Sequence, residues 1–298
     1  MFRNAYILLL LTTLFWGGNS IAGKLAVGHV SPMVLTTLRW TLATAVVLAI
    51  ALPQFRSDWP VVRRNLLLLF ALGTAGFTMF NLALYSALMF TSAINVSIEQ
   101  AGMPMLIFVA NFVLYRMRVA MGQIVGFTMS LVGVVLTASH GDLSRLAELD
   151  LNSGDAIMLI ALVVYAGYTV ALRYKPAIHW KSLMLALCIA ALISSLPFAA
   201  WEIATDRAIW PDARGWGVVA YTAILPSILS QAFYIRGVEL IGANRAGLFI
   251  NLVPIFGTLL SIMILGEDFH LYHAAALAMV LGGIALAEYS GRKMAAGR

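Results

Sequence analysis

Charged residues are scarce in this chain. Asp, Glu, Lys and Arg together make up 11% of its 298 residues, whereas 61% of the residues are hydrophobic and the mean hydropathy is +0.91. Soluble domains carry about 25% charged residues. Because so few charges do not cover a surface that faces water, the composition excludes a soluble protein and predicts one that is dissolved in lipid.

The sequence also lacks the residue sets of intramembrane enzymes and metal sites. The single cysteine, Cys188, excludes an internal disulfide. The five histidines lie at or near the ends of apolar segments, and no segment interior holds a Ser–His, paired-Asp or HExxH arrangement. His270 and His273 have the spacing of metal ligands, but they lie beside a predicted loop and are interpreted as interfacial polar residues. We therefore expect no enzyme, no metal and no cofactor.

Long apolar runs are what the chain does contain. A bilayer core of about 30 Å needs about 20 apolar residues per helix. Ten such segments follow one another with short connections, at residues 5–25, 33–53, 65–87, 92–114, 121–138, 154–174, 182–201, 215–237, 245–265 and 271–290. Barrel strands are excluded, because they are about 10 residues long and alternate strictly. We predict an all-α, polytopic membrane protein with ten transmembrane helices.

The basic residues are divided unevenly between the two sides of these segments. Fourteen of the 19 Lys and Arg residues fall on the side that holds both termini, four fall on the other side, and Arg39 lies within a helix. Short loops rich in Lys and Arg stay in the cytoplasm, so both termini are predicted to be cytoplasmic. The net charge of +6 is thus a topology signal, and no nucleic-acid partner is expected.

The sequence repeats weakly after about half its length. Segment 92–139 overlies 242–289 without a gap at a shift of 150, and the shift aligns Pro104 with Pro254. Proline within a helix costs about 3 kcal/mol, so the paired prolines carry more weight than matching apolar residues.

The repeat extends to the first segment of each half. FWGGNSIAGK (15–24) overlies VYAGYTVALR (164–173) at a shift of 149. Each half, 1–140 and 141–298, then contains five predicted helices, and an odd number turns the second half upside down relative to the first. Inverted repeats of this kind are typical of secondary transporters, whose substrate site lies at the repeat interface.

Several motifs resemble the drug/metabolite transporter superfamily, and within it the members built of two tandem EamA-like halves. They are the early Trp-Gly pair, SPMVLTTLRW (31–40), a mid-helix proline after a short turn containing SA, and GEDFHLYHAAALAMVLGGIAL (266–286). The likeness covers almost the whole chain and is greatest to bacterial aromatic amino-acid exporters. It implies a ten-helix bundle in the bacterial inner membrane that moves small metabolites by alternating access. In the first half, YRMRV (115–119) replaces the glycine-glutamate turn.

Polar and aromatic residues recur at helical spacing on the first, third, sixth and eighth predicted helices. Because polar side chains avoid lipid, we predict that these faces line a central cavity and bind substrate. The candidates are Trp16, Asn19, Phe77, Phe80, Asn81, Tyr85, Tyr165, Tyr168, Ser227, Gln231 and Tyr234. Asn81 and Gln231 lie 150 residues apart and are predicted to occupy equivalent places. Alternatively, these residues only hold helices together or fill the bundle core.

Two ionisable residues lie deep within predicted helices. Arg39 and Glu99 are each seven residues past the outer end of a helix, so both lie about 10 Å deep. We predict that they interact, directly or through water. Their role is either a structural ion pair or, for Glu99, the coupling of transport to protons.

The predicted function is secondary transport of small metabolites, with neutral and aromatic amino acids as the first choice. Cationic drugs, nucleosides and a passive channel are the alternatives. Pro104, Pro226 and Pro254 are predicted to mark kinks at which helices bend during transport, although static kinks fit the sequence equally well. The expected partners are the substrate and the lipid bilayer, and two fused halves favour a monomer.

Overall fold

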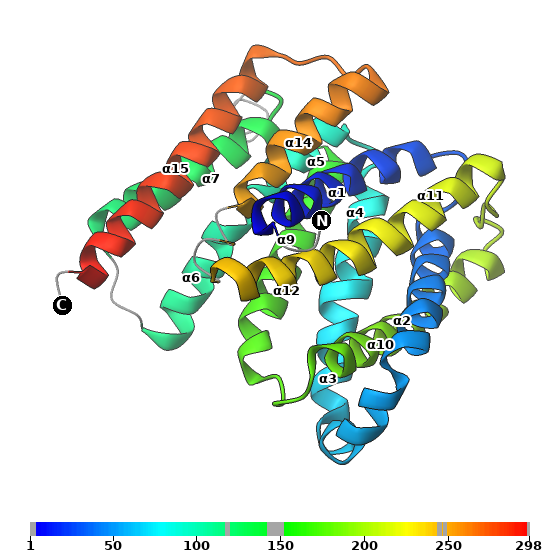
Figure 1. Ribbon diagram of the computed structural model, residues 1–298. Helices are drawn as coiled ribbons and strands as arrows, with labels where there is room; N and C mark the ends of the chain where they lie inside the picture. The colour runs from blue at the N-terminus through cyan, green and yellow to red at the C-terminus, as the bar shows by residue number, and fades with distance from the viewer. Residues whose placement is uncertain (1–3, 117–119, 142–151, 243–245, 247–248, 297–298) are drawn as a thin grey trace.

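The structure is a computed structural model that describes residues 4–116, 120–141, 152–242, 246 and 249–296 (Figure 1). Its α-helices are α1 (Ala5–Ala26), α2 (Pro32–Val62), α3 (Leu66–Gly73), α4 (Phe80–Ala87), α5 (Ala93–Gln100), α6 (Met103–Tyr115), α7 (Met121–Ala138), α9 (Ser153–Ala171), α10 (Trp180–Ala204), α11 (Ala213–Ile224), α12 (Ser230–Ile241), α14 (Val253–Leu260) and α15 (Leu271–Ala296). Short 3-10 helices are η1 (Arg63–Asn65), η3 (Leu172–Tyr174) and η5 (Ile250–Leu252), and π-helices are η2 (Thr74–Met79), η4 (Leu225–Leu229) and η6 (Ser261–Leu265). The described residues contain no strand.

The helices are long and apolar enough for a polytopic membrane protein. Among the described residues, seven helical runs can cross a membrane, and two shorter apolar helices, Met121–Thr137 and Ile250–Leu265, accompany them. One run, Pro32–Ala87, has 56 residues, and Figure 1 shows the chain reversing between α2 and α3 within it. The prediction of an all-α membrane protein is confirmed in this form, and the number of ten spans stays a prediction.

Helices α2 and α10 pack together, and each provides a carboxylate that caps the start of the other. Near the end of α10, Glu202 accepts hydrogen bonds from the Ser31 hydroxyl at 2.6 Å and from the Val34 backbone N–H at 3.1 Å. Near the end of α2, Asp58 accepts from the His179 backbone N–H at 3.0 Å. The free N–H groups and positive dipole at a helix start favour a carboxylate there. This exchange of caps fixes the two helices antiparallel.

The remaining helices pack across the chain midpoint in matched pairs. Helix α1 packs on α12 and α14, α9 packs on α4 and α6, and α7 packs along α15 (Figure 1). Glycine permits the closest of these approaches, because a Cβ on Gly126 of α7 would lie 2.4 Å from the carbonyl oxygen of Gly283 on α15.

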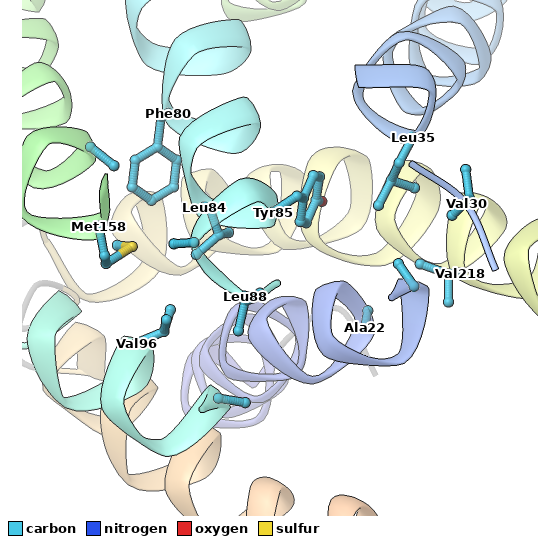
Figure 2. Close-up of a cluster of buried hydrophobic side chains, with 14 of the residues drawn as sticks. Ala22, Val30, Leu35, Phe80, Leu84, Tyr85, Leu88, Val96, Met158 and Val218 are labelled. Carbon is cyan, nitrogen blue, oxygen red and sulfur yellow. The ribbon is translucent and has the colours of Figure 1, made fainter. Parts of the chain in front are cut away.

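The largest apolar cluster lies where α1, α4 and α9 meet α2, α5 and α11 (Figure 2). Its members Leu35, Leu84, Leu88 and Met158 are fully buried. Val30 belongs to the same cluster and lies in the turn between α1 and α2, which is a predicted outer loop. Apolar packing therefore fills the end of the bundle that contains this turn.

Three helices are interrupted at or beside the predicted hinge prolines. Pro226 lies within η4, and Pro104 and Pro254 lie in the first turn of α6 and α14, each directly after a break in the helix. Pro104 and Pro254 thus begin new helical segments, where a missing N–H is tolerated. Pro226 instead lies within the continuous helical run Ala213–Ile241, in its π-helical part. Their movement as hinges stays a prediction.

Candidate functional site

Arg39 is the centre of a buried polar cluster. The residue is 4% exposed. Its guanidinium donates from Nε to the Ser227 hydroxyl at 2.8 Å. Its Nη1 donates to the side-chain oxygens of Asn81 at 2.6 Å and Asn19 at 3.2 Å, and to the Tyr85 hydroxyl. Four predicted site residues on α1, α4 and η4 are therefore brought together by one cation that comes from α2.

The neutral partners are oriented by hydrogen bonds of their own. Asn81 donates from its amide nitrogen to the Phe77 carbonyl at 2.7 Å, and Ser227 donates its hydroxyl proton to the Thr222 carbonyl at 2.8 Å. Their donors are therefore used elsewhere, and their oxygens point at Arg39. Such an arrangement is pre-organised for a positive charge.

Donors remain unused beside this cluster. No carboxylate of a described residue forms a salt bridge with Arg39, and its Nη2 makes no hydrogen bond to a described residue. The Arg39 guanidinium lies 5.0 Å from the ring centre of Trp40, whose buried Nε1 is also without a partner. A buried ion without a counter-ion costs several kcal/mol. The cluster therefore lacks a negative charge that would balance Arg39.

Aromatic rings extend from Trp40 across the bundle. Trp40 stacks on Phe77 at 4.7 Å between ring centres, Phe77 meets the edge of Tyr168 at 6.2 Å, Tyr168 lies 5.2 Å from Tyr165, and Tyr165 lies 4.6 Å from Phe80. We call these five residues the aromatic wall. Four of them were predicted from the sequence, and Trp40 was missed although it follows Arg39 directly.

The other predicted site residues lie apart from Arg39. Trp16 donates from Nε1 to the Pro226 carbonyl at 3.1 Å, and its ring lies 5.6 Å from that of Tyr234. Gln231 lines a separate cavity of about 30 Å³ between α2, α10 and α12. Asn81 and Gln231 do hold matching places along the chain, since each is the second residue after a π-helix. Their surroundings nevertheless differ, because Asn81 bonds to Arg39 and Gln231 lines the separate cavity.

Glu99 on α5 has a different environment from the one predicted. It is 0% exposed, and both carboxylate oxygens lack a hydrogen-bond partner. No salt bridge joins it to Arg39 among the described residues, so the direct form of the predicted interaction is absent, and a contact through water stays a prediction. The two residues lie on helices that face different neighbours, and the coupling role of Glu99 stays a prediction.

A second buried polar cluster was missed by the sequence analysis. Asp155, at the start of α9, accepts a hydrogen bond from the Thr91 hydroxyl, and the Asn95 amide nitrogen lies 3.5 Å from the same oxygen. His140 lies with Nε2 3.2 Å from the other oxygen of Asp155, at ion-pair distance but without hydrogen-bond alignment. His273 bonds to Asn95 at 3.1 Å. An acidic residue in the first turn of an apolar segment was the available sequence signal.

His273 corrects one prediction directly. It was interpreted as an interfacial residue, but it is 3% exposed. Its Nδ1 accepts the backbone N–H of His270 at 3.0 Å, so the proton of the neutral ring is on Nε2 and is donated to Asn95. His273 is therefore a buried member of this cluster.

The turns before α2 and α11 hold a second carboxylate–imidazole pair. His29 lies with Nδ1 2.7 Å from Asp212, which also caps the start of α11 by accepting the Gly215 N–H at 2.8 Å. The hydrogen bond from the Gly215 backbone holds the pKa of Asp212 below its ordinary value, and the hydrogen bond with His29 makes the next largest contribution. This pair lies outside the membrane-spanning helices.

Comparison with known proteins gives a consistent result. The sequence model of the EamA-like transporter family matches residues 3–139 and 152–289. The chain is 26% identical to the uncharacterized transporter YyaM of Bacillus subtilis, over 96% of this chain and 93% of that protein. It is also 26% identical to an uncharacterized transporter of Archaeoglobus fulgidus, over 96% of this chain and 98% of that protein. A crystal structure with 22% identity has the same fold, with a TM-score of 0.65 over 97% of this chain and 98% of that one.

Proposed function

Because the chain belongs to the EamA-like transporter family, we propose that it exports neutral and aromatic amino acids across the bacterial inner membrane, binding them at Arg39. The observation that carries this proposal is a buried guanidinium surrounded by neutral oxygens, with Nη2 unused. A substrate carboxylate would supply the missing negative charge and accept from Nη2. Charge-assisted hydrogen bonds from arginine to carboxylate are among the strongest in proteins.

The aromatic wall suits the remainder of such a substrate. Flat apolar side chains pack favourably against aromatic rings, with about 0.5–1.5 kcal/mol per ring pair beyond the area buried. The Nε1 of Trp40 has no partner, and the Trp40 ring lies 5.0 Å from the Arg39 guanidinium, so this N–H is a second donor for a carboxylate oxygen. A cationic drug fits this site poorly, because it would bring a second positive charge next to Arg39.

Alternating access is supported by the way the two halves pack. If the halves 1–140 and 141–298 are exchanged, the contacts of α1 with α12 and α14 take the place of those of α9 with α4 and α6, and the pairs α2–α10 and α7–α15 map onto themselves. The reciprocal caps of α2 and α10 and the paired π-helices η2 and η4 follow the same exchange. An inverted repeat can close at one face while it opens at the other.

The arrangement described here is the one closed to the outside. The apolar cluster around Leu35 and Leu88 covers the outer end, whereas the cavity beside Gln231 lies between helices near the predicted cytoplasmic end and includes Lys181. We infer that substrate enters from the cytoplasm in this state. Both termini are proposed to be cytoplasmic, and the two fused halves to act as a monomer.

Arg39→Gln tests the substrate proposal. In proteoliposomes, we expect the variant to lower the apparent affinity for phenylalanine about 10- to 100-fold, since hydrogen bonds to charged groups contribute about 1.5–3 kcal/mol. Radiolabelled counterflow is the measurement, and Arg236→Gln, which removes an exposed arginine paired with Glu239, is the matched control. Phenethylamine, which lacks the carboxylate, is expected not to compete.

Three outcomes would contradict the proposal. Unchanged phenylalanine counterflow in Arg39→Gln would exclude Arg39 as the binding group. Transport of a cationic dye or a nucleoside without any phenylalanine transport would show that the substrate belongs to one of the alternative classes. Flux that neither saturates nor shows counterflow would indicate a passive channel.

A further inference from the structure

We propose that Glu99 is a proton-binding site and that His140 and Asp155 connect it to the outer face of the membrane. This inference rests on the transporter function proposed above and adds the ion that drives transport. It uses helices α5 and α9 and the turn after α7, and it shares no residue with the Arg39 cluster.

Glu99 is built to hold a proton in this conformation. Its carboxyl group is fully buried, and neither oxygen has a hydrogen-bond partner. Its neighbours Ile94 and Ile98 on α5 pack into an apolar cluster with α7 and α15. An ionised carboxylate in such surroundings costs several kcal/mol, whereas the neutral acid loses only its hydrogen bonds to water. The side chain therefore binds a proton here and releases it when the site is hydrated.

The helices around α5 bring few other charges to Glu99. Helices α7 and α14 and the π-helix η6 contain no acidic, basic or histidine residue. Lys24 on α1 donates to two backbone carbonyls, and His273 on α15 is bonded to Asn95. The tyrosines of α9 belong to the aromatic wall. Asp155 on α9 is the ionisable group whose charge acts on Glu99.

Asp155 connects this site with the surface. Asn95, which lies 3.5 Å from Asp155, is one helical turn before Glu99 on α5, so the two carboxyl groups are on the same side of that helix. On its other side, Asp155 lies 3.2 Å from Nε2 of His140, whose side chain is 31% exposed. The partly exposed His140, the buried Asp155 and the buried Glu99 thus follow one another inward from the predicted outer face.

The proton transfer along this path is simple to balance. His140 takes up a proton from outside water, and the imidazolium gives its Nε2 proton to the Asp155 carboxylate. Asp155 then passes a proton to ionised Glu99 and is itself left as a carboxylate, while His140 returns to its neutral form. Two carboxyl groups in one buried site do not both ionise readily, so a proton that reaches Asp155 is favoured to move on to Glu99.

Three conservative variants test the path. Glu99→Gln and Asp155→Asn keep the shape of each side chain, and the asparagine still accepts from Thr91, while His140→Gln removes the entry group. In proteoliposomes, we expect phenylalanine accumulation driven by a pH gradient to fall to the level reached without a gradient. Counterflow at equal pH is expected to persist, because the Arg39 cluster is untouched. Asp212→Asn is the matched control, since it changes the other outer carboxylate–imidazole pair and is expected to keep the gradient-driven accumulation.

A second measurement is independent of the substrate. Infrared spectra of the purified protein at neutral pH are expected to contain the carbonyl band of a buried carboxylic acid, and Glu99→Gln is expected to lose it. Gradient-driven accumulation retained in Glu99→Gln and Asp155→Asn would overturn the path. If the wild-type protein transports no amino acid, the proposed substrate fails, and the infrared comparison alone decides: loss of the band in Glu99→Gln supports the proton site, and identical spectra overturn it.

Discussion

Arg39 shows how one buried residue organises a site. Asn19, Asn81, Tyr85 and Ser227 come from the three segments α1, α4 and η4, and each directs an oxygen at the same guanidinium. None of them carries a negative charge, so the protein solvates Arg39 without neutralising it. A site of this kind binds an anion reversibly, because the cation is held in place both before the anion arrives and after it leaves.

The variants Asn81→Leu and Gln231→Leu distinguish two possible reasons for a loss of transport. One is the loss of a contact with Arg39, and the other is the matching position in the sequence repeat. The sequence repeat alone predicts equal losses of transport. The structure predicts a larger loss for Asn81→Leu, about 1.5–3 kcal/mol in substrate affinity, since it removes a charge-assisted bond. Gln231, which contacts a different cavity, is expected to have a smaller effect. Counterflow titrations with phenylalanine measure both, and equal affinities in the two variants would contradict this order.

At the scale of elements, glycine and helix interruptions decide how the helices meet. Helices α7 and α15 approach closely at Gly126 and Gly283, and helices in lipid associate largely through such close packing. The π-helices η2 and η4 each precede an amide-bearing helix, and single π-turns of this kind are frequent at functional sites.

Gly126→Ala tests the α7–α15 contact. The added Cβ would lie 2.4 Å from a carbonyl oxygen of α15, so the helices must separate, and we expect a loss of about 1–3 kcal/mol in stability. Gly217→Ala is the control, because no atom lies within 4 Å of its added Cβ and alanine favours a helix by about 1 kcal/mol. Thermal unfolding in detergent is the measurement. Equal melting temperatures for the two variants would refute the close approach.

At the scale of the whole molecule, the distribution of the basic residues predicts the topology. The turn that contains Arg207 and the turn that contains Lys175 lie at opposite ends of α10, and both residues are exposed. The natural Cys188 is buried, so it gives little background labelling. With a membrane-impermeant maleimide, Arg207→Cys is expected to react in intact cells, and Lys175→Cys only after permeabilisation. Reaction of both variants in intact cells would contradict the predicted crossing of the membrane by α10.

The helical segments and the membrane setting could be predicted from the sequence because they depend on local composition. An apolar run of about 20 residues is helical in lipid whatever surrounds it, since every backbone polar group must be bonded within the segment. The predicted segment 121–138 coincides with α7, and 271–290 lies within α15. Polar residues at helical spacing also identified Asn19, Asn81, Tyr85 and Ser227 as members of one site.

The partners of each charge depended on the tertiary structure. Equal depth suggested that Arg39 and Glu99 meet, but depth does not determine which side of a helix faces which neighbour. Helix rotation and packing place Arg39 among amides and hydroxyls, and leave Glu99 unpaired beside the helix that carries Asp155. The sequence by itself determined an apolar helical membrane protein with two similar halves. Only long-range packing decided which polar groups share a site, because contacts between distant segments are not encoded by local periodicity.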